Sequence, residues 1–251
     1  MHQVTNDDIR YGRPVRQFYG KWPFVRIFGV QEVASTIFSV ANCLAHVSAL
    51  RRYRSRVPRR YRLYWVWQAN SLVSIHAWVW STVFHARDVP FTERMDYFAA
   101  TSLIVMQVFC QQMRIVGGSR PARNAVSWLL GAIDASVYAS YVYYMAFIRF
   151  DYGFNINFNV TLGVLMMCTW FGWCFVCKDK QPYVWKCVLF LLLLFSAMGL
   201  ELGDFPPVFG LFDAHSLWHL ATIPLPLLWY SFVVDDARYE LKEQSVVLGR
   251  L

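Results

Sequence analysis

Five polar residues stand in or beside long apolar stretches of this 251-residue sequence, and together their side chains could hold and use a metal ion. Two histidines lie four apart in AHSLWHLA, and a serine precedes another histidine by four in STVFH. A separation of four places two side chains on one face of a helix. An aspartate follows that histidine by eleven residues. The five are Ser81, His85, Asp96, His215 and His219.

Three imidazoles and a water form the usual ligand set of a catalytic zinc ion, whereas a structural site is closed by a fourth protein ligand and calcium prefers oxygen. We therefore predict that His85, His215 and His219 bind Zn2+. Zinc lowers the pKa of a bound water to roughly 7. Asp96 would accept a proton from that water or orient a ligand imidazole, and Ser81 would hydrogen-bond the water or a developing oxyanion. This chemistry indicates a hydrolase whose substrate enters from lipid.

Other ionisable residues allow different interpretations. The three histidines could instead make structural contacts only, and His46 and His76 are interpreted as hydrogen-bonding between helices. Asp88, Asp204 and Asp213 are competing acids on the same side, less favoured because two lie in turns and the third points away from His215.

Two further acids lie within predicted membrane spans, where a charge is costly. Glu32 and Asp134 could pair with polar neighbours such as Asn42 or Asn70, or line a cavity. The sequence gives neither a definite role.

The elements that must position these residues are membrane-spanning helices. The chain is 57% hydrophobic and only 16% charged, whereas a soluble domain carries about 25% charged residues. Several charge-free runs reach the roughly 20 residues that cross a bilayer. We predict an all-α polytopic membrane protein, a bundle of seven helices. The predicted spans are 27–50, 61–85, 95–113, 125–148, 158–177, 183–200 and 208–233.

Basic residues predict how the bundle is oriented. Loops after spans one, three and five, with the C-terminal tail, hold sixteen Lys and Arg, and the other loops hold only Arg87, Arg94 and Arg149. By the positive-inside rule the C-terminus is cytosolic and the N-terminus lumenal. The arginine-rich RRYRSRVPRR (51–60) lies between two spans, so it indicates the cytosolic face and not a nucleic-acid site. The predicted division is a lumenal tail 1–26, a helical domain 27–235 and a cytosolic tail 236–251.

The pattern SxxxH, then Asp, then HxxxH in the last span resembles the signature of the CREST superfamily of seven-helix membrane hydrolases, which includes the alkaline ceramidases. Three longer stretches narrow the likeness. KWPFVRIFGVQEVAS (21–35), FHARDVPFTERMDYF (84–98) and LELGDFPPVFGLFDAHSLWHLATIPL (200–225) are similar to the Per-one-like family of GPI-specific phospholipases. The resemblance extends over about residues 17 to 235.

This resemblance implies a phospholipase A2-type enzyme of the endoplasmic reticulum or Golgi that removes the sn-2 acyl chain of GPI anchors on GPI-anchored proteins, with its site facing the lumen. It carries the zinc ligands over to His85, His215 and His219, with Asp96 and Ser81 beside the water. Family members usually begin with a signal peptide and a cysteine-rich segment that this sequence does not show, so a fragment or a short form is expected. The alternatives are a ceramidase-type amidase and a non-enzymatic receptor or remodelling factor with a structural metal.

Overall fold

The regular structure in the described part of the chain is helical, apart from isolated bridges at three tight turns. The computed structural model describes residues 4, 5, 7, 10–18, 20–117 and 121–248. The main helices are α2 (Val33–Arg56), α3 (Tyr64–Ala86), α4 (Pro90–Ile115), α5 (Pro121–Tyr143), α6 (Tyr152–Cys177), α7 (Trp185–Leu202), α8 (Ala214–Thr222) and α9 (Leu225–Leu248). A π-helical turn, η1 (Tyr144–Ile148), extends α5, and a 3-10 turn, η2 (Pro182–Val184), precedes α7.

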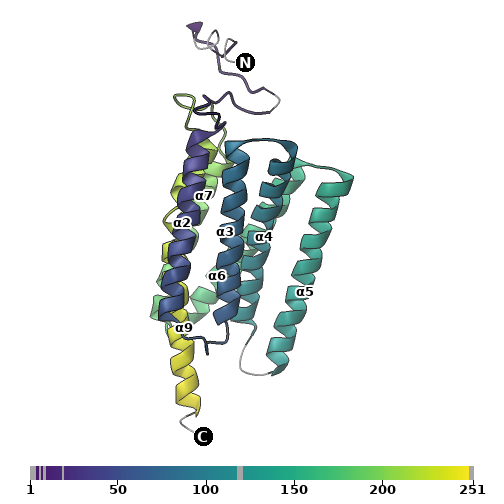
Figure 1. Ribbon diagram of the computed structural model, residues 1–251. Coiled ribbons are helices and arrows are strands. Elements are labelled where there is room, and N and C mark those ends of the chain that lie inside the picture. The colour runs from purple at the N-terminus through teal and green to yellow at the C-terminus, as the bar shows by residue number, and fades with distance from the viewer. Residues whose placement is uncertain (1–3, 6, 8–9, 19, 118–120, 249–251) are drawn as a thin grey trace.

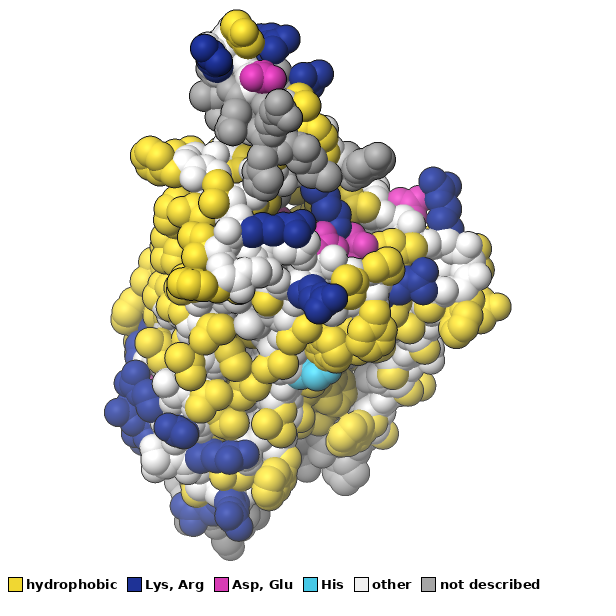
Figure 2. Space-filling view, turned by 45° about the horizontal axis from the view of Figure 1, so that its top comes forward, with side chains coloured by type: hydrophobic (Ala, Val, Ile, Leu, Met, Phe, Trp, Pro, Cys, Tyr) yellow, Lys and Arg dark blue, Asp and Glu magenta, His cyan; other side chains and the backbone are white. Residues whose placement is uncertain are grey.

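The helices run up and down in one bundle, with short connections between neighbours (Figure 1). α2 packs against α3, α8 and α9, α4 packs against α3, α5 and α6, and α5 stands at the outer edge. One end of the bundle holds the start of α2, the end of α3 and the start of α8, and we call it the histidine end. The opposite end, where α2 finishes and α3 begins, is the arginine end. Hydrophobic side chains cover much of the visible surface between them (Figure 2).

Length and composition suit this bundle to a membrane. In the described part of the chain, five segments are long and apolar enough to cross a bilayer: Val33–Arg56, Ala125–Ile148, Tyr152–Cys177, Pro182–Leu202 and Ala214–Val246. α3 and α4 are outside that set but have 23 and 26 residues and lie alongside the others (Figure 1). The predicted class, a helical membrane protein, is confirmed, whereas the number of spans and their orientation stay predictions.

The starts of α2, α4, α6 and α8 differ from the expected ones by five or six residues, and local backbone chemistry explains the first two. α2 begins at Val33 and not near residue 27, since Phe28 and Gly29 adopt positive φ in a tight turn. α4 begins at Pro90, a favoured first position because proline lacks the amide hydrogen that a helix start cannot satisfy. Val89 is the N-cap, and the hydroxyl of Thr92, in the first turn, accepts the Val89 amide hydrogen at 3.0 Å.

The arginine end is also more helical than expected. Arg51 to Arg56 form the last turns of α2 and are not part of a loop. Arg114 is one of the sixteen basic residues that the sequence places in loops or the tail. It lies in α4 with only 8% of its surface exposed. Its guanidinium donates to both oxygens of Asp236 in α9, at 2.6 and 2.7 Å, and the Tyr183 hydroxyl donates to the same carboxylate at 2.8 Å.

The last predicted span is broken into two helices. Pro224 has no amide hydrogen, so a continuous helix cannot pass through it without losing a bond, and α8 ends at Thr222 before α9 begins at Leu225. The carbonyl oxygen of His219 instead accepts a hydrogen bond from the Asn42 side chain of α2 at 2.7 Å. The break therefore ties the histidine-bearing helix α8 to α2.

Candidate metal centre

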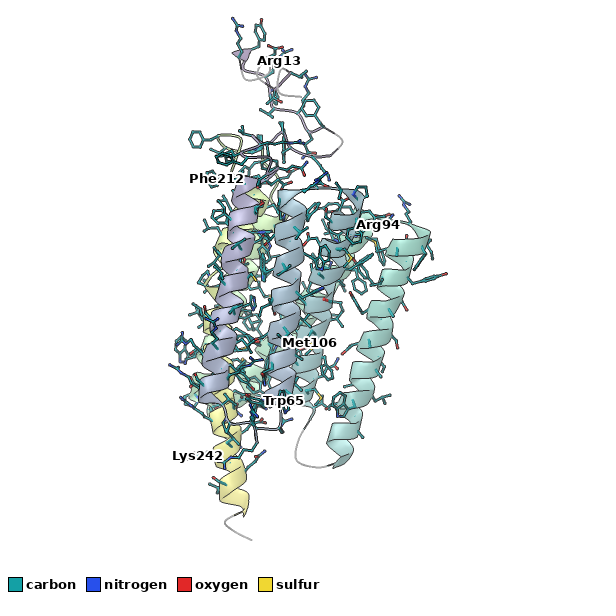
Figure 3. The ribbon with its side chains drawn as sticks, in the orientation of Figure 1. Arg13, Trp65, Arg94, Met106, Phe212 and Lys242 are labelled. Carbon is teal, nitrogen blue, oxygen red and sulfur yellow. The ribbon has the colours of Figure 1, made fainter. Side chains whose placement is uncertain are left out.

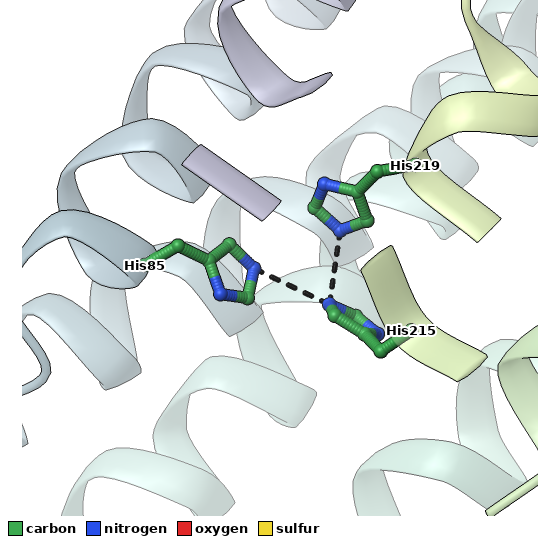
Figure 4. A group of neighbouring side chains, drawn as sticks. All are labelled: His85, His215 and His219. Atoms are coloured by element: carbon green, nitrogen blue, oxygen red, sulfur yellow. Dashed lines mark hydrogen bonds between the residues drawn. The ribbon is translucent and has the colours of Figure 1, made fainter. Parts of the chain in front are cut away.

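Three histidines from two distant parts of the chain meet at the histidine end of the bundle (Figure 4). His85 comes from the last turn of α3, and His215 and His219 come from one face of α8. The Nε2 atom of His215 lies 3.2 Å from Nε2 of His85 and 2.9 Å from Nε2 of His219. All three ligand atoms lie within 4.8 Å of one another.

Each imidazole uses its other nitrogen to contact a polar side chain. Nδ1 of His85 lies 2.7 Å from a carboxylate oxygen of Glu32, and Nδ1 of His215 lies 2.7 Å from one of Glu201. Carboxylates accept hydrogen bonds, so both Nδ1 atoms carry the proton.

The third imidazole is oriented by a serine. Nδ1 of His219 lies 2.8 Å from the Ser39 oxygen. The Ser39 hydroxyl donates to the Ser35 carbonyl at 2.7 Å, so its oxygen is free to accept from His219. A neutral imidazole protonated at Nδ1 presents a lone pair at Nε2. Three lone pairs therefore face one another, an arrangement that a bound cation stabilises.

These residues fit a zinc ion. Ligand nitrogens on a tetrahedral zinc with bonds of about 2.0–2.1 Å are separated by roughly 3.3 Å, and two of the three nitrogen pairs here lie at 2.9 and 3.2 Å. Histidine ligands oriented by a carboxylate or another acceptor are the usual supporting arrangement. Within the described residues no fourth His, Cys, Asp or Glu joins the group, which leaves a coordination position for a water or substrate.

The site is buried on two sides and open on the third. The His85 side chain is 3% exposed and His219 is 3% exposed, whereas the side chains of His215 and its partner Glu201 are 36% and 31% exposed. Access to the converging nitrogens is therefore from the side on which α7 and the start of α8 carry Glu201 and His215.

Backbone contacts set the position of each ligand-bearing segment. The amide hydrogens of Gln31 and Glu32 bond the carbonyls of Ala86 and His85, which fixes the segment before α2 to the end of α3. Asp213 caps α8, its carboxylate accepting the Ser216 amide hydrogen at 2.8 Å. Thus Asp213, a competing acid in the sequence, has a structural role here.

The sequence matches a known protein family over nearly its whole length. The model of the Per1-like family matches residues 1–237. The chain belongs to the Per1-like family. It is 45% identical to a Xenopus tropicalis protein named GPI-specific phospholipase A2-like PGAP3, over 93% of this chain and 73% of the relative.

Two other relatives extend the comparison across animals. The human protein of the same name is 43% identical, over 94% of this chain and 73% of its own length. The Drosophila melanogaster protein named post-GPI attachment to proteins factor 3 is 40% identical, over 88% of this chain and 67% of its own. No solved structure matches the chain.

In this Per1-like chain, the two other predicted site residues lie at the same end as the histidines. The Asp96 carboxyl, in the second turn of α4, interacts electrostatically with His85 and His215, but it makes no hydrogen bond or ion pair among the described residues. The Ser81 hydroxyl is buried, one turn before His85, and lies 3.0 Å from the Ser39 oxygen. It thus contacts His219 indirectly, through Ser39.

Glu32 and Asp134, to which the sequence assigns no role, lie in different parts of the structure. Glu32 pairs with His85, not with an asparagine, so it orients one of the candidate metal ligands. Asp134 lies away from the site, where it accepts a hydrogen bond from Gln112 at 3.2 Å, and it lines a hollow of about 460 Å³ between α3, α4 and α5.

Contrary to the prediction, His46 and His76 make no hydrogen bond between helices among the described residues. The His76 ring accepts a hydrogen bond from Trp80 of its own helix at 3.0 Å, and Nδ1 of His46 is buried without a partner among the described residues. Both lie outside the group of converging ligands, as expected.

The other competing acids hold the segment before α2 in place. Asp88 pairs with Lys21, and Asp204 accepts hydrogen bonds from Gln17 at 2.9 Å and from the Trp22 indole at 2.6 Å. These side-chain contacts help to fasten the part of the chain before α2 across the histidine end.

Sequence reasoning missed Ser39 and Glu201, which orient two of the three imidazoles. Glu201 carried a usable signal, since it is an acid at the end of an otherwise charge-free apolar run. Ser39 carried none, because a serine in an apolar helix commonly bonds its own backbone four residues earlier, as Ser39 also does here.

Proposed function

We propose that this protein is a zinc-dependent membrane hydrolase that removes the sn-2 acyl chain of GPI anchors on GPI-anchored proteins. The observation that carries the proposal is the convergence of three Nε2 lone pairs, with every Nδ1 atom held by Glu32, Ser39 or Glu201. The names of the relatives supply the substrate: two are called GPI-specific phospholipase A2-like.

His85, His215 and His219 would hold the ion. When bound, zinc would supply an activated water and polarise the ester carbonyl. Asp96 would accept the proton of the attacking water, because its carboxylate lies near two of the ligands and has no protein partner among the described residues. The same carboxyl group would then give the proton to the departing alcohol.

Ser81 has two possible tasks in this reaction. Its hydroxyl would either stabilise the developing oxyanion or hold Ser39 so that His219 keeps its orientation, and the 3.0 Å contact with Ser39 favours the second. The exposed edge formed by His215 and Glu201 would admit the ester group from the surrounding lipid.

Turnover of defined lipids by purified protein tests the proposal. Zinc-loaded protein in nanodiscs would be offered GPI lipids, diacyl phospholipids and ceramides in turn, with the His215→Ala variant as the control. We expect free fatty acid and lyso-GPI from the GPI lipid alone. Cleavage of ceramide would instead indicate an amidase. No turnover of any lipid by the metal-loaded protein would favour a receptor or remodelling factor.

We also propose that the metal centre faces the lumen of the endoplasmic reticulum or Golgi, as the distribution of basic residues predicts. Single cysteines at two exposed positions, Arg59→Cys and Phe91→Cys, would be compared in a chain whose native cysteines are replaced. In sealed microsomes a membrane-impermeant thiol reagent should label position 59 directly and position 91 only after permeabilisation. The reverse pattern would place the site in the cytosol and exclude GPI-anchored proteins as substrates.

A further inference from the structure

Two turns at the histidine end share a two-residue sequence and a rare backbone conformation. Phe28-Gly29 lies between Ile27 and Val30, and Phe209-Gly210 lies in the turn that a bridge between Val208 and Phe212 closes. The phenylalanines have φ of 52° and 56°, and the glycines that follow have φ of 83° and 70°. We call residues 27–30 and 208–212 the FG turns.

A phenylalanine is a poor choice for such a turn. Turns with positive φ at both central residues favour Asn-Gly, because a bulky side chain at positive φ is strained. Strained backbone of this kind is unfavourable and concentrates at functional sites. Two independent occurrences in one chain, both with phenylalanine where asparagine would fit better, point to a use for the aromatic ring.

Both rings are also directed away from the protein. Phe28 is 103% exposed and Phe209 is 86% exposed, so neither ring stabilises the fold by packing against it. Burying a phenylalanine in an apolar environment is favourable relative to leaving it in water. These two side chains therefore keep that free energy available for something outside the chain.

The FG turns form one surface and not two separate ones. The Val25 amide hydrogen bonds the Gly210 carbonyl at 2.9 Å. A Cβ atom on Gly210 would lie 2.7 Å from a Val25 methyl carbon, so only glycine permits this approach. Exposed apolar side chains surround the contact, and they are Val25, Ile27, Val208 and Phe212.

This apolar surface continues into the outer surface of the bundle. The Phe212 ring contacts Phe38 of α2 with centroids 6.4 Å apart, and Figure 3 shows Phe212 beside the first turns of α2. Further along α2, Ile37 and Leu44 are 58% and 59% exposed on one face.

We propose that the FG turns insert into the lipid bilayer at the boundary between acyl chains and headgroups. A bilayer is the partner that an apolar surface continuous with membrane-spanning helices must meet, and rings and aliphatic side chains at this depth are typical of interfacial anchors. Arg26 stands exposed between Val25 and Ile27, where its guanidinium would reach lipid phosphates.

Insertion would set the depth of the metal centre in the membrane. Phe28 precedes Glu32, the partner of His85, by four residues, and Phe209 precedes the ligand His215 by six. Each FG turn is thus joined by a short segment to one side of the histidine cluster. Anchoring both turns in the interface would hold the centre at the level of the glycerol esters, a consequence that rests on the proposed function.

Probe depth at the two turns tests the proposal without requiring turnover. Spin labels would be attached to Phe28→Cys and Phe209→Cys in a chain whose native cysteines are replaced, and the protein placed in phosphatidylcholine nanodiscs. We expect collisions with oxygen to exceed those with a water-soluble nickel chelate at both positions, and the opposite at the exposed control Tyr11→Cys. Nickel access equal to that of the control, or shielding from both reagents as in a protein contact, would overturn the proposal.

A second variant tests the purpose of the rings. Asparagine accepts positive φ, so Phe28→Asn with Phe209→Asn should leave the fold and the zinc content intact. Its hydrolysis of substrate in bilayers should fall at least about tenfold, with hydrolysis of the same lipid in detergent unchanged, because each ring's burial is worth that much or more. Equal rates for the variant and the parent chain in bilayers would overturn the anchoring role. If the protein proved not to be a hydrolase, the label measurement would still decide whether the turns insert.

Discussion

The two ends of the bundle both bury ionisable side chains, but they satisfy them differently. At the arginine end, Arg114 and Asp236 are 8% and 1% exposed, and both carboxylate oxygens accept charge-assisted hydrogen bonds. At the histidine end, three imidazoles are fixed at Nδ1, and their Nε2 lone pairs face one another. The Arg114–Asp236 pair is satisfied by hydrogen bonds within the chain. The histidine cluster has more hydrogen-bond acceptors than donors facing one another.

Both clusters are buried and ionisable, but only the second would be completed by a ligand. A complete ion pair fixes α4 against α9 and needs no ligand. Converging lone pairs repel unless a proton or a metal ion lies between them, so a bound cation would stabilise the histidine end. The comparison predicts that substitutions at the histidine end alter metal content and chemistry, while those at the arginine end alter stability.

The largest effect is expected for the metal ligands. Purified protein should contain about one zinc per chain, and His85→Ala, His215→Ala or His219→Ala should each lose most of it, since a three-ligand site does not tolerate a missing ligand. The zinc content would be measured by elemental mass spectrometry. His76→Ala, which removes a histidine outside the cluster, should keep its zinc. Full retention in all three ligand variants would disprove the site.

Asp96→Asn should separate binding from chemistry. The amide keeps the size of the side chain but cannot act as a base, so the variant should retain zinc and lose about 10²–10⁴-fold in hydrolysis. The acyl chains of released GPI anchors would be analysed by mass spectrometry in cells that lack the native enzyme. Normal remodelling by a zinc-replete variant would refute the assignment, and Asp88 and Asp204 would be examined next as bases.

Arg114→Met should affect stability at the arginine end and leave the histidine end unchanged. Removing one partner leaves the buried Asp236 carboxylate with Tyr183 as its one hydrogen-bond partner among the described residues, which typically costs about 3–5 kcal/mol of stability. The melting temperature in detergent should fall, while the zinc content of the folded fraction stays near one per chain. Loss of zinc with unchanged thermal stability would show that the two ends are not independent.

The sequence predicted the helical membrane class and the meeting of His85, His215 and His219, because a four-residue spacing fixes a face and short connections fix the order of helices. It did not predict the partners of those histidines. Ser39 and Glu201 reach the site only through the packing of α2 and α7 against α8, which no local pattern records. The predicted start of α2 was wrong for a related reason. The Phe28-Gly29 turn interrupts a run of residues that is apolar enough to continue a helix.

The smallest predicted effect, and the sharpest test of the comparison, concerns Glu201. Its carboxylate accepts from Nδ1 of His215, and both side chains lie at the open edge of the site, where water can partly replace a lost contact. Glu201→Gln should therefore weaken zinc affinity by about 10–100-fold, the usual effect of losing a partner that orients a ligand, without abolishing binding. Zinc affinity would be measured by competition with a chelator. Glu32→Gln is the matched variant: its partner His85 is almost fully buried, so its loss of affinity should be at least as large. If neither substitution changed the zinc affinity, the carboxylates would not be orienting the imidazoles. The proposed difference between the two ends of the bundle would then be wrong for the histidine end.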